Sequence, residues 1–307
     1  MDEVDLPAKP LHLAVGMFDG VHLGHQAVIE TATQLAQATQ GINAVLTFWP
    51  HPSRLFRPDN PEHMIMSPEI KVEVLRSHKV QYVIQQKFDL AFAAIEATDF
   101  VGHLKSFLPN LNSIHVGSNW RFGKGRAGDV QLLLQSCRKA GIHVISVERV
   151  NYDGQPISST RIRNHLKAGE MKMANALLGD VYFSLGPAIQ GNKLGREMGF
   201  PTLNLPWNSD LKPPYGVYCV EVEGECEGAT ITLPGVANFG LRPTVEKTTE
   251  PILEVHALRQ CPFTHGSRLK VRWHHFLRTE KTFEGVESLR KQIALDVREA
   301  RRYWGLT

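Results

Sequence analysis

Two histidines three positions apart lie in a glycine-rich stretch near the start of the 307-residue chain, Gly16-Met17-Phe18-Asp19-Gly20-Val21-His22-Leu23-Gly24-His25. The glycines let the backbone turn sharply and approach a ligand closely. If a helix begins here, its unpaired N–H groups and the positive end of its dipole favour an anion. Both imidazoles then share a face and point toward that anion. The spacing therefore indicates phosphate binding and nucleotide chemistry.

The elements that must position this stretch are a strand before it and a helix after it. The apolar run at 11–15 predicts the strand, and the segment from about 25 to 39 predicts the helix. Apolar runs and helical patterns then alternate, which predicts a parallel sheet covered by helices, with ligands bound at the carboxyl ends of the strands. Further strands are expected at 43–48, 82–84, 113–116 and 143–147, and further helices near 68–78, 99–107 and 130–140.

Three later segments of this half could contribute to the same site. His51 is framed by prolines after a predicted strand, and Asn119 and Arg121 lie in a loop, residues 117–129, where glycines alternate with cations and two aromatics. In the third segment Ser159 and Thr160 offer a helix cap, and Arg161 opposes the helix dipole unless an anion compensates. Each segment also has an ordinary explanation: His51 could be a loop histidine, residues 117–129 a surface loop, and Ser159 and Thr160 a common helix cap.

The second half has a different character from about residues 179–186 onward. Strand-like segments at 216–222, 229–233, 252–258 and 268–276 with short turns predict a compact antiparallel barrel, closed by an amphipathic helix near 286–304. Thr202 and Asn204 share one face of an extended segment, where they could hold Mg²⁺ with substrate phosphates or form a solvated face. Glu254 stands in an apolar run, where an unpaired carboxylate would be costly to bury unless it faces solvent.

The stretch from residue 16 to 25 resembles the signature of the HxGH nucleotidyltransferases, in the form carried by prokaryotic bifunctional riboflavin kinase/FAD synthetases. Thr-Phe-x-Pro-His-Pro from residue 47, Val-Gly-x-x-x-x-Phe-Gly-x-x-x-x-Gly-Asp from 116 and Ile-Ser-Ser-Thr-x-Ile-Arg from 157 resemble the remaining adenylyltransferase motifs of that family. Gly-Arg-x-x-Gly-Phe-Pro-Thr-x-Asn from 195 resembles the riboflavin-kinase signature, and residues 238–244 resemble the Asn-x-Gly-x-Arg-Pro-Thr loop of the family. The resemblance spans residues from about 11 to 304.

The resemblance implies an FMN adenylyltransferase domain at 1–181 and a riboflavin kinase domain at 182–307, acting on riboflavin, FMN, FAD and ATP with Mg²⁺ or another divalent cation. It implies catalytic roles for His22 and His25, and makes Glu254 the base that deprotonates riboflavin. In the first domain it implies ATP or phosphate binding by Gly16, Phe18, Asp19, Gly24, His51, Asn119, Arg121, Ser159, Thr160 and Arg161. In the second it implies binding of ATP, metal or flavin by Gly191, Lys193, Gly195, Arg196, Gly199, Phe200, Pro201, Thr202, Asn204, Asn238, Arg242 and Arg278, with Thr202 and Asn204 as the metal ligands.

Whole-chain composition is compatible with a cytoplasmic enzyme of small molecules. The net charge of +3 is too small to require nucleic acid or an acidic membrane as a partner. No secretory signal or membrane-spanning run is expected, and four cysteines without CxxC spacing predict reduced thiols. Three alternatives stay open: an HxGH transferase acting on nicotinate or pantetheine phosphates, a flavin-binding regulator without catalysis, and a member that keeps one activity.

Overall fold

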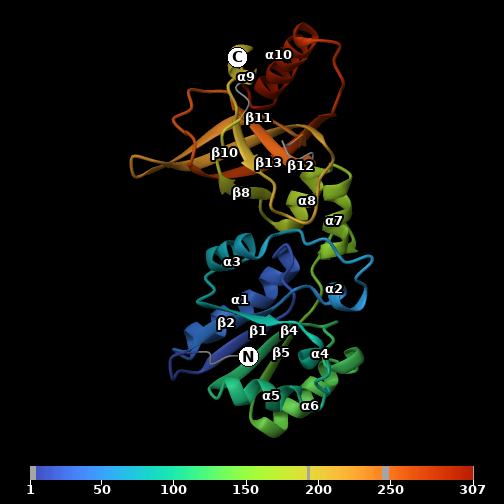
Figure 1. The fold of residues 1–307 in the computed structure, drawn as a ribbon. Coiled ribbons are helices and arrows are strands. Elements are labelled where there is room, and N and C mark those ends of the chain that lie inside the picture. The colour runs from blue at the N-terminus through green and yellow to red at the C-terminus, as the bar shows by residue number, and fades with distance from the viewer. Residues whose placement is uncertain (1–4, 192–193, 244–248, 307) are drawn as a thin grey trace. The chain divides into compact units, whose positions relative to one another are not determined.

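The computed structural model describes residues 5–191, 194–243 and 249–306, without the side chains of residues 194, 196, 242, 243 and 249 (Figure 1). The chain divides into two compact units, Met1–Ser159 and Thr160–Thr307. Each unit is described by itself below.

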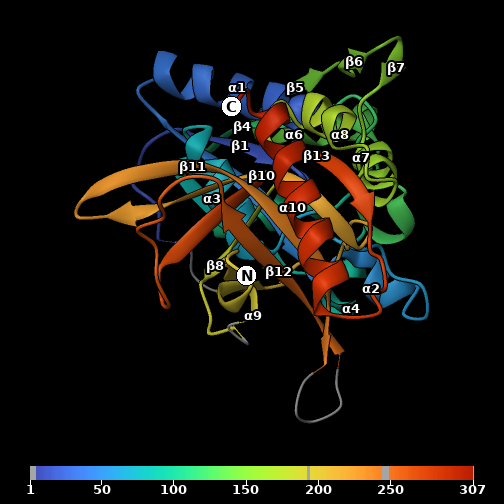
Figure 2. The ribbon, with the colours of Figure 1, turned by 90° about the horizontal axis from the view of Figure 1, so that it is seen from above.

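The first unit is built on a five-stranded parallel sheet of order β3-β2-β1-β4-β5. Its strands are β1 (Leu11–Val15), β2 (Ile42–Trp49), β3 (Tyr82–Lys87), β4 (Leu111–Gly117) and β5 (His143–Val147). The longer helices are α1 (Leu23–Ala38), α3 (Pro68–Ser77), α5 (Phe100–Phe107) and α6 (Val130–Ala140); the shorter ones are α2 (Pro52–Phe56), α4 (Leu90–Ala93) and η1 (Lys124–Arg126). The predicted parallel sheet with helical crossovers is confirmed. A small hairpin of β6 (Asn151–Tyr152) and β7 (Gln155–Pro156) was not predicted (Figure 2).

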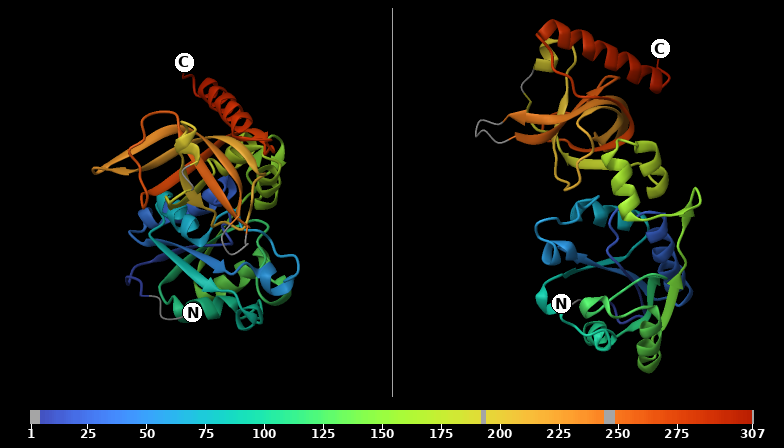
Figure 3. Two further views of the ribbon diagram at one scale, coloured as in Figure 1. Left: turned by 45° about the horizontal axis from the view of Figure 1, so that its top comes forward. Right: turned by 90° about the vertical axis from the view of Figure 1, so that its right-hand side faces the viewer.

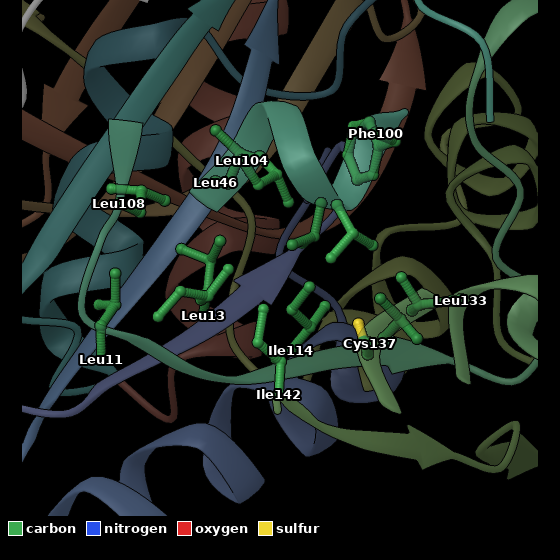
Figure 4. Close-up of a cluster of buried hydrophobic side chains, with 14 of the residues drawn as sticks. Leu11, Leu13, Leu46, Phe100, Leu104, Leu108, Ile114, Leu133, Cys137 and Ile142 are labelled. Atoms are coloured by element: carbon green, nitrogen blue, oxygen red, sulfur yellow. The ribbon is translucent and has the colours of Figure 1, made fainter. Parts of the chain in front are cut away.

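Helices cover both faces of this sheet because side chains alternate along each strand. On one face, Leu13 and Ile114 pack in a cluster with Phe100, Leu104 and Leu133 of α5 and α6 (Figure 4). On the other face α1 packs through a buried polar chain. His12 contacts Ser113 and Thr39 at 2.7 Å each, and the His115 ring contacts Ser113 at 2.7 Å and Thr31 at 2.8 Å. The sheet is thus held rigidly, with the loops at its carboxyl edge left to form a site.

The second unit is a six-stranded antiparallel sheet that curls into a nearly closed barrel, as the second half of the sequence predicts. The order is β8-β13-β10-β11-β12-β9, with bounds β8 (Phe183–Pro187), β9 (Leu203–Pro206), β10 (Gly216–Cys226), β11 (Ala229–Pro243), β12 (Thr249–Ala257) and β13 (Arg268–Thr279). The two sheet ends approach where the Ile189 N–H donates to Asn204 O at 2.8 Å. Residues 238–243, expected as a loop, instead continue β11, because β12 pairs with them and satisfies their backbone. Their glycine and proline content hides the strand from the sequence.

Helices flank the barrel of the second unit. α7 (Ser159–Lys167) and α8 (Met171–Leu178) precede it, the one-turn α9 (Leu194–Glu197) precedes β9, and α10 (Val286–Tyr303) closes the chain against the barrel (Figure 3). Asn175 of α8 donates to Trp273 O and accepts from the Tyr182 N–H, both at 2.9 Å. Arg278 of β13 binds Asp296 of α10 through two hydrogen bonds of 2.8 and 2.6 Å. None of the helices in the described segments is long and apolar enough to cross a bilayer.

Candidate functional site

A cavity of about 1000 Å³ opens at the carboxyl edge of the sheet in the first unit. Its lining includes Val15, Phe48, Gly117 and Val147, which lie at the carboxyl ends of four of the strands. Nine residues expected to act in the nucleotide site line it: Gly16, Phe18, His22, Gly24, His25, His51, Asn119, Arg121 and Ser159. The structure therefore assembles in one hollow segments that are up to 143 residues apart in sequence (159 − 16).

The two histidines lie against each other at the start of α1. His22 is the N-cap, and its Nδ1 accepts a hydrogen bond of 3.3 Å from the His25 backbone N–H. The rings stack at 3.7 Å between centroids with an interplanar angle of 15°. Nδ1 of His25 is buried and has no hydrogen-bond partner among the described residues, and His25 lines the cavity.

Burial keeps both imidazoles neutral at pH 7. It lowers the pKa of His22 to about 4. The pKa of His25 is also held well below its ordinary value, first by burial and then by the positive charge that His22 and Lys71 can carry. Because His22 Nδ1 accepts a hydrogen bond, a neutral His22 carries its proton on Nε2, and His22 can donate that proton to an anion.

Asp19 lies behind the turn and not in the cavity lining. Its carboxylate is 1% exposed and accepts from the N–H groups of Ile65 at 3.0 Å and Met66 at 3.4 Å. The Ser159 hydroxyl donates to the Asp19 carbonyl at 2.8 Å. Asp19 therefore anchors the turn. Thr160 and Arg161 follow Ser159 in the first turn of α7 and belong to the second unit.

His51 and the glycine loop supply two further walls. His51 is the N-cap of α2, where its Nδ1 accepts from the Ser53 N–H at 3.1 Å. The glycine loop adds stacked Trp120 and Phe122 rings, with centroids 4.7 Å apart. Further lining residues that no sequence motif indicates are Phe88, Phe92, Phe100 and Arg149, and the glycine loop adds Arg126. The phenylalanines follow β3 and Arg149 follows β5, so only the folded sheet brings them together. The cavity thus has an aromatic side, where Phe92, Phe100, Trp120 and Phe122 pack ring against ring, and cations among its other lining residues.

In the barrel, three expected kinase residues lie on one rung of the sheet. Strand register places Asn238 of β11 opposite Glu254 of β12, and Glu254 opposite Asn204 of β9. Directly opposite residues share a face, with Cβ atoms roughly 5 Å apart. The adjacent rung, Phe239, Leu253 and Leu205, is at most 1% exposed and fills the barrel. The polar rung therefore faces out of the barrel core, with Asn204 itself 4% exposed.

The glycines of the kinase signature bring backbone close to this rung. A Cβ at Gly191 would collide with the side-chain amide of Asn204. A Cβ at Gly195 would lie 2.6 Å from Phe200 O and 3.5 Å from Thr202 Oγ1. Gly199 has φ +88°, and the Pro201 carbonyl lies 2.9 Å from His256 Nδ1. Lys193 and the side chains of Arg196 and Arg242 lie outside the described part of the chain.

Two residues near the C-terminus complete the surroundings of the rung. A Cβ at Gly240 would collide with the carboxylate of Glu280, a residue to which sequence reasoning assigned no role, and would lie 3.3 Å from Asn238 Nδ2. Glu280 thus approaches the same face as Glu254. Arg278 directs its guanidinium to Asp296, which is 4% exposed, and to Thr279 O. Two of its N–H groups therefore hold α10 on the barrel.

The donor atoms around the rung suit a hard cation. Thr202 and Asn204 offer a hydroxyl and an amide oxygen, and Glu254 offers a carboxylate on the same face as Asn204. Mg²⁺ prefers such oxygens and shares its coordination with substrate phosphates. Within the described residues there is no cluster of three or more His, Cys, Asp or Glu side chains that could hold a metal alone.

Comparison with known proteins covers nearly the whole chain. Residues 7–161 match the family model of FAD synthetase, and residues 178–304 match that of riboflavin kinase. The bifunctional riboflavin kinase/FMN adenylyltransferase of Escherichia coli strain K12 is 35% identical, over 98% of this chain and 95% of its own. The protein of the same name from Bacillus subtilis strain 168 is 36% identical, over 95% and 92%. A crystal structure of a macrolide-efflux protein from Streptococcus pneumoniae superposes with a TM-score of 0.83 and 27% identity, over 97% and 95%.

Proposed function

The chain belongs to the family of bifunctional riboflavin kinase/FMN adenylyltransferases, and from this membership we propose how its residues divide the two reactions. The protein is a transferase that phosphorylates riboflavin to FMN with ATP and then adenylylates FMN to FAD. The observation that supports the division is that each unit assembles its own set of expected residues: the cavity of the first unit and the polar rung of the second.

In the first unit, the cavity around His22 and His25 is the proposed adenylyltransferase site. An FMN phosphate oxygen attacks the α-phosphorus of ATP, and the bond to pyrophosphate breaks. Nε2 of His25 and of His22 donate hydrogen bonds to the phosphate oxygens as negative charge moves onto them. Arg121, Arg126 and Arg149 balance the polyphosphate charge, and the aromatic side takes the flavin ring. Phosphate is already an anion at neutral pH, so this reaction needs no base.

In the second unit, Glu254 is the proposed base of the kinase reaction. The 5′-hydroxyl of riboflavin attacks the γ-phosphorus of ATP, ADP leaves, and the hydroxyl proton passes to the Glu254 carboxylate. Asn238, on the same rung, is placed to orient the hydroxyl or the transferred phosphate. Gly191 and Gly195 let their loop approach closely enough to cover the phosphates.

Thr202 and Asn204 are the proposed ligands of Mg²⁺ or another divalent cation. A bound cation would neutralise the phosphate oxygens of ATP and withdraw charge toward the leaving group. The surrounding residues fit this role, because the Thr202 hydroxyl lies beside Gly195 and the nearly buried Asn204 amide lies beside Gly191. Glu254, next to them, keeps its role toward the proton.

The proposed boundary between the activities is at about residues 181/182. The riboflavin kinase model begins at 178, whereas the compact units meet earlier, at Ser159/Thr160. We also propose a cytoplasmic location, supported by four free cysteines in the described chain, because oxidising compartments favour disulfides.

One chromatographic assay tests the assignment. The full-length protein is incubated with ATP, Mg²⁺ and either riboflavin or FMN, and FMN and FAD are separated. The proposal expects His25→Ala to stop at FMN, and Glu254→Gln to make FAD from supplied FMN but not from riboflavin. Loss of both activities in either variant, with the protein folded by circular dichroism, would refute the two-site division.

A further inference from the structure

A lysine is buried behind the glycine-rich turn of the first unit. Lys71, on α3, is 3% exposed, and its Nζ donates to the Met17 carbonyl at 3.1 Å and to Thr47 Oγ1 at 3.3 Å. The Thr47 hydroxyl in turn donates to the same Met17 carbonyl at 2.9 Å. An ionised side chain is rarely buried without a reason, because its desolvation is costly. Neither a motif nor the proposed chemistry has given Lys71 a role.

The two hydrogen bonds fix the orientation of one peptide group. The Met17–Phe18 bond is trans, so its C=O and N–H point in opposite directions. With the carbonyl held by Lys71 and Thr47 on the buried side, the Phe18 N–H points to the other side of the peptide. Met17 and Phe18 both line the cavity, so this peptide group lies at the cavity wall.

The segment that leads into α3 also binds the turn at a second place, through the negative charge of Asp19. The Asp19 carboxylate accepts from the Ile65 and Met66 N–H groups just before α3. Burial lowers the pKa of Lys71, and the negative charge of Asp19 opposes that shift. The positive charge of Lys71 also contributes to the lowered pKa of His25. The segment from Ile65 to Lys71 therefore holds the back of the turn at two places, through the Asp19 carboxylate and through the Lys71 ammonium group.

We propose that Lys71 is a positioning residue of the adenylyl-transfer site, which orients the Met17–Phe18 peptide so that the Phe18 N–H binds a phosphate of ATP. The proposal rests on the function proposed for this cavity. Thr47 is the second support of the same peptide. The ammonium group lies behind the turn and outside the cavity lining, so it acts through the backbone and through its field without touching the nucleotide.

The test compares three variants of the full-length protein in the conversion of supplied FMN to FAD. Lys71→Met removes the charge and keeps the aliphatic stem. Thr47→Val removes the hydrogen bond to the Met17 carbonyl and the one accepted from Lys71, and leaves the charge. Arg76→Met, on the exposed side of the same helix, is the matched control for loss of a positive charge. We expect kcat/KM for ATP to fall about tenfold to a hundredfold in Lys71→Met, the scale of one lost hydrogen bond to a charged group. The expected loss is smaller in Thr47→Val and within twofold in Arg76→Met. Riboflavin phosphorylation is unchanged in all three.

Two NMR readouts separate positioning from general loosening. Labelling with ¹⁵N-phenylalanine leaves fourteen amide signals, and pyrophosphate should shift the Phe18 signal in the natural protein but much less in Lys71→Met. The pKa of His25 should rise in Lys71→Met and stay constant in Thr47→Val, where the charge remains. If the natural protein makes FAD but pyrophosphate does not shift its Phe18 amide signal, the positioning proposal is wrong and the proposed function stands. A natural protein that makes no FAD would overturn the function itself. If Lys71→Met does not fold, an unchanged kcat/KM in Thr47→Val refutes the proposal.

Discussion

The stacked pair His22 and His25 should make the first unit sensitive to acid. Burial lowers the pKa of His22 from 6.5 to about 4 and holds the pKa of His25 well below 6.5. The unfolded chain has ordinary histidines, so between these values it binds protons that the folded pair does not. The stability that the neutral pair contributes is therefore complete above about pH 6.5 and is lost as the pH falls toward 4.

The size of the effect follows from the shifts. Each histidine that is neutral in the folded state and charged in the unfolded state costs about 1.4 kcal/mol of unfolding free energy per pH unit. At pH 5 this cost is about 2 kcal/mol for His22, against a typical total of about 5–15 kcal/mol, and His25 adds a cost of the same sign. His25→Gln keeps a polar side chain but removes one titrating group. It should therefore make the pH slope shallower, whatever it does to stability at pH 7.

Hydrogen exchange measured by mass spectrometry can follow this slope within the intact protein. Exchange of peptides from β1 and α1, corrected for intrinsic rates, gives the opening free energy of the first unit between pH 7.5 and 5. Peptides from β10 and β11 report on the barrel and serve as the internal control. The reasoning is refuted if natural protein and His25→Gln lose protection in β1 with the same slope.

Three further substitutions or truncations test the sites. His25→Ala should reduce FMN adenylylation by roughly a hundredfold to ten-thousandfold, the scale of a pre-placed transition-state donor, and leave phosphorylation of riboflavin intact; steady-state rates of both reactions measure this. Glu254→Gln should lower kinase turnover by about a hundredfold to ten-thousandfold, more than it changes KM for ATP; a normal turnover would exclude Glu254 as the base. A fragment beginning at residue 160 should fold and make FMN but no FAD, whereas one beginning at 182 should be less stable because Asn175 no longer binds Trp273 O and the Tyr182 N–H; circular dichroism melting compares them.

Periodicity predicted most of the architecture because one face of each element is buried. The helix expected from about 25 to 39 is Leu23–Ala38, and the strand expected at 143–147 is His143–Val147. Failures occurred where periodicity is short or interrupted. The four-residue α4 and the hairpin of β6 and β7 are too short to show a period, and β11 extends ten residues beyond the predicted end at 233 because Gly and Pro interrupt its pattern (243 − 233).

The sequence predicted those site residues that lie in contiguous motifs and missed those that only the fold brings to the sites. The glycine-rich turn, the loop histidine and the Thr-x-Asn pair are contiguous stretches with unusual composition. Lys71 and Glu280 are not. Lys71 lies in an ordinary amphipathic helix, and its partners Met17 and Thr47 are 54 and 24 residues away. The Glu280 carboxylate lies beside Gly240, which is distant from it in the sequence. Such relations depend on tertiary structure, which no local pattern encodes.

The two sites differ in a way that their reactions explain. The nucleophile of the first reaction, a phosphate, is already charged, so the site needs donors and cations; its turn accordingly directs its one carboxylate, Asp19, backward into backbone N–H groups. The nucleophile of the second reaction is an alcohol, which must lose a proton. A base must then face the substrate, and Glu254 stands on an outward rung between two amides that carry no charge of their own. Removing the Glu254 carboxylate from the second site would leave the hydroxyl proton without its proposed acceptor. The stacked histidines and the proposed base accordingly lie in different units of the chain.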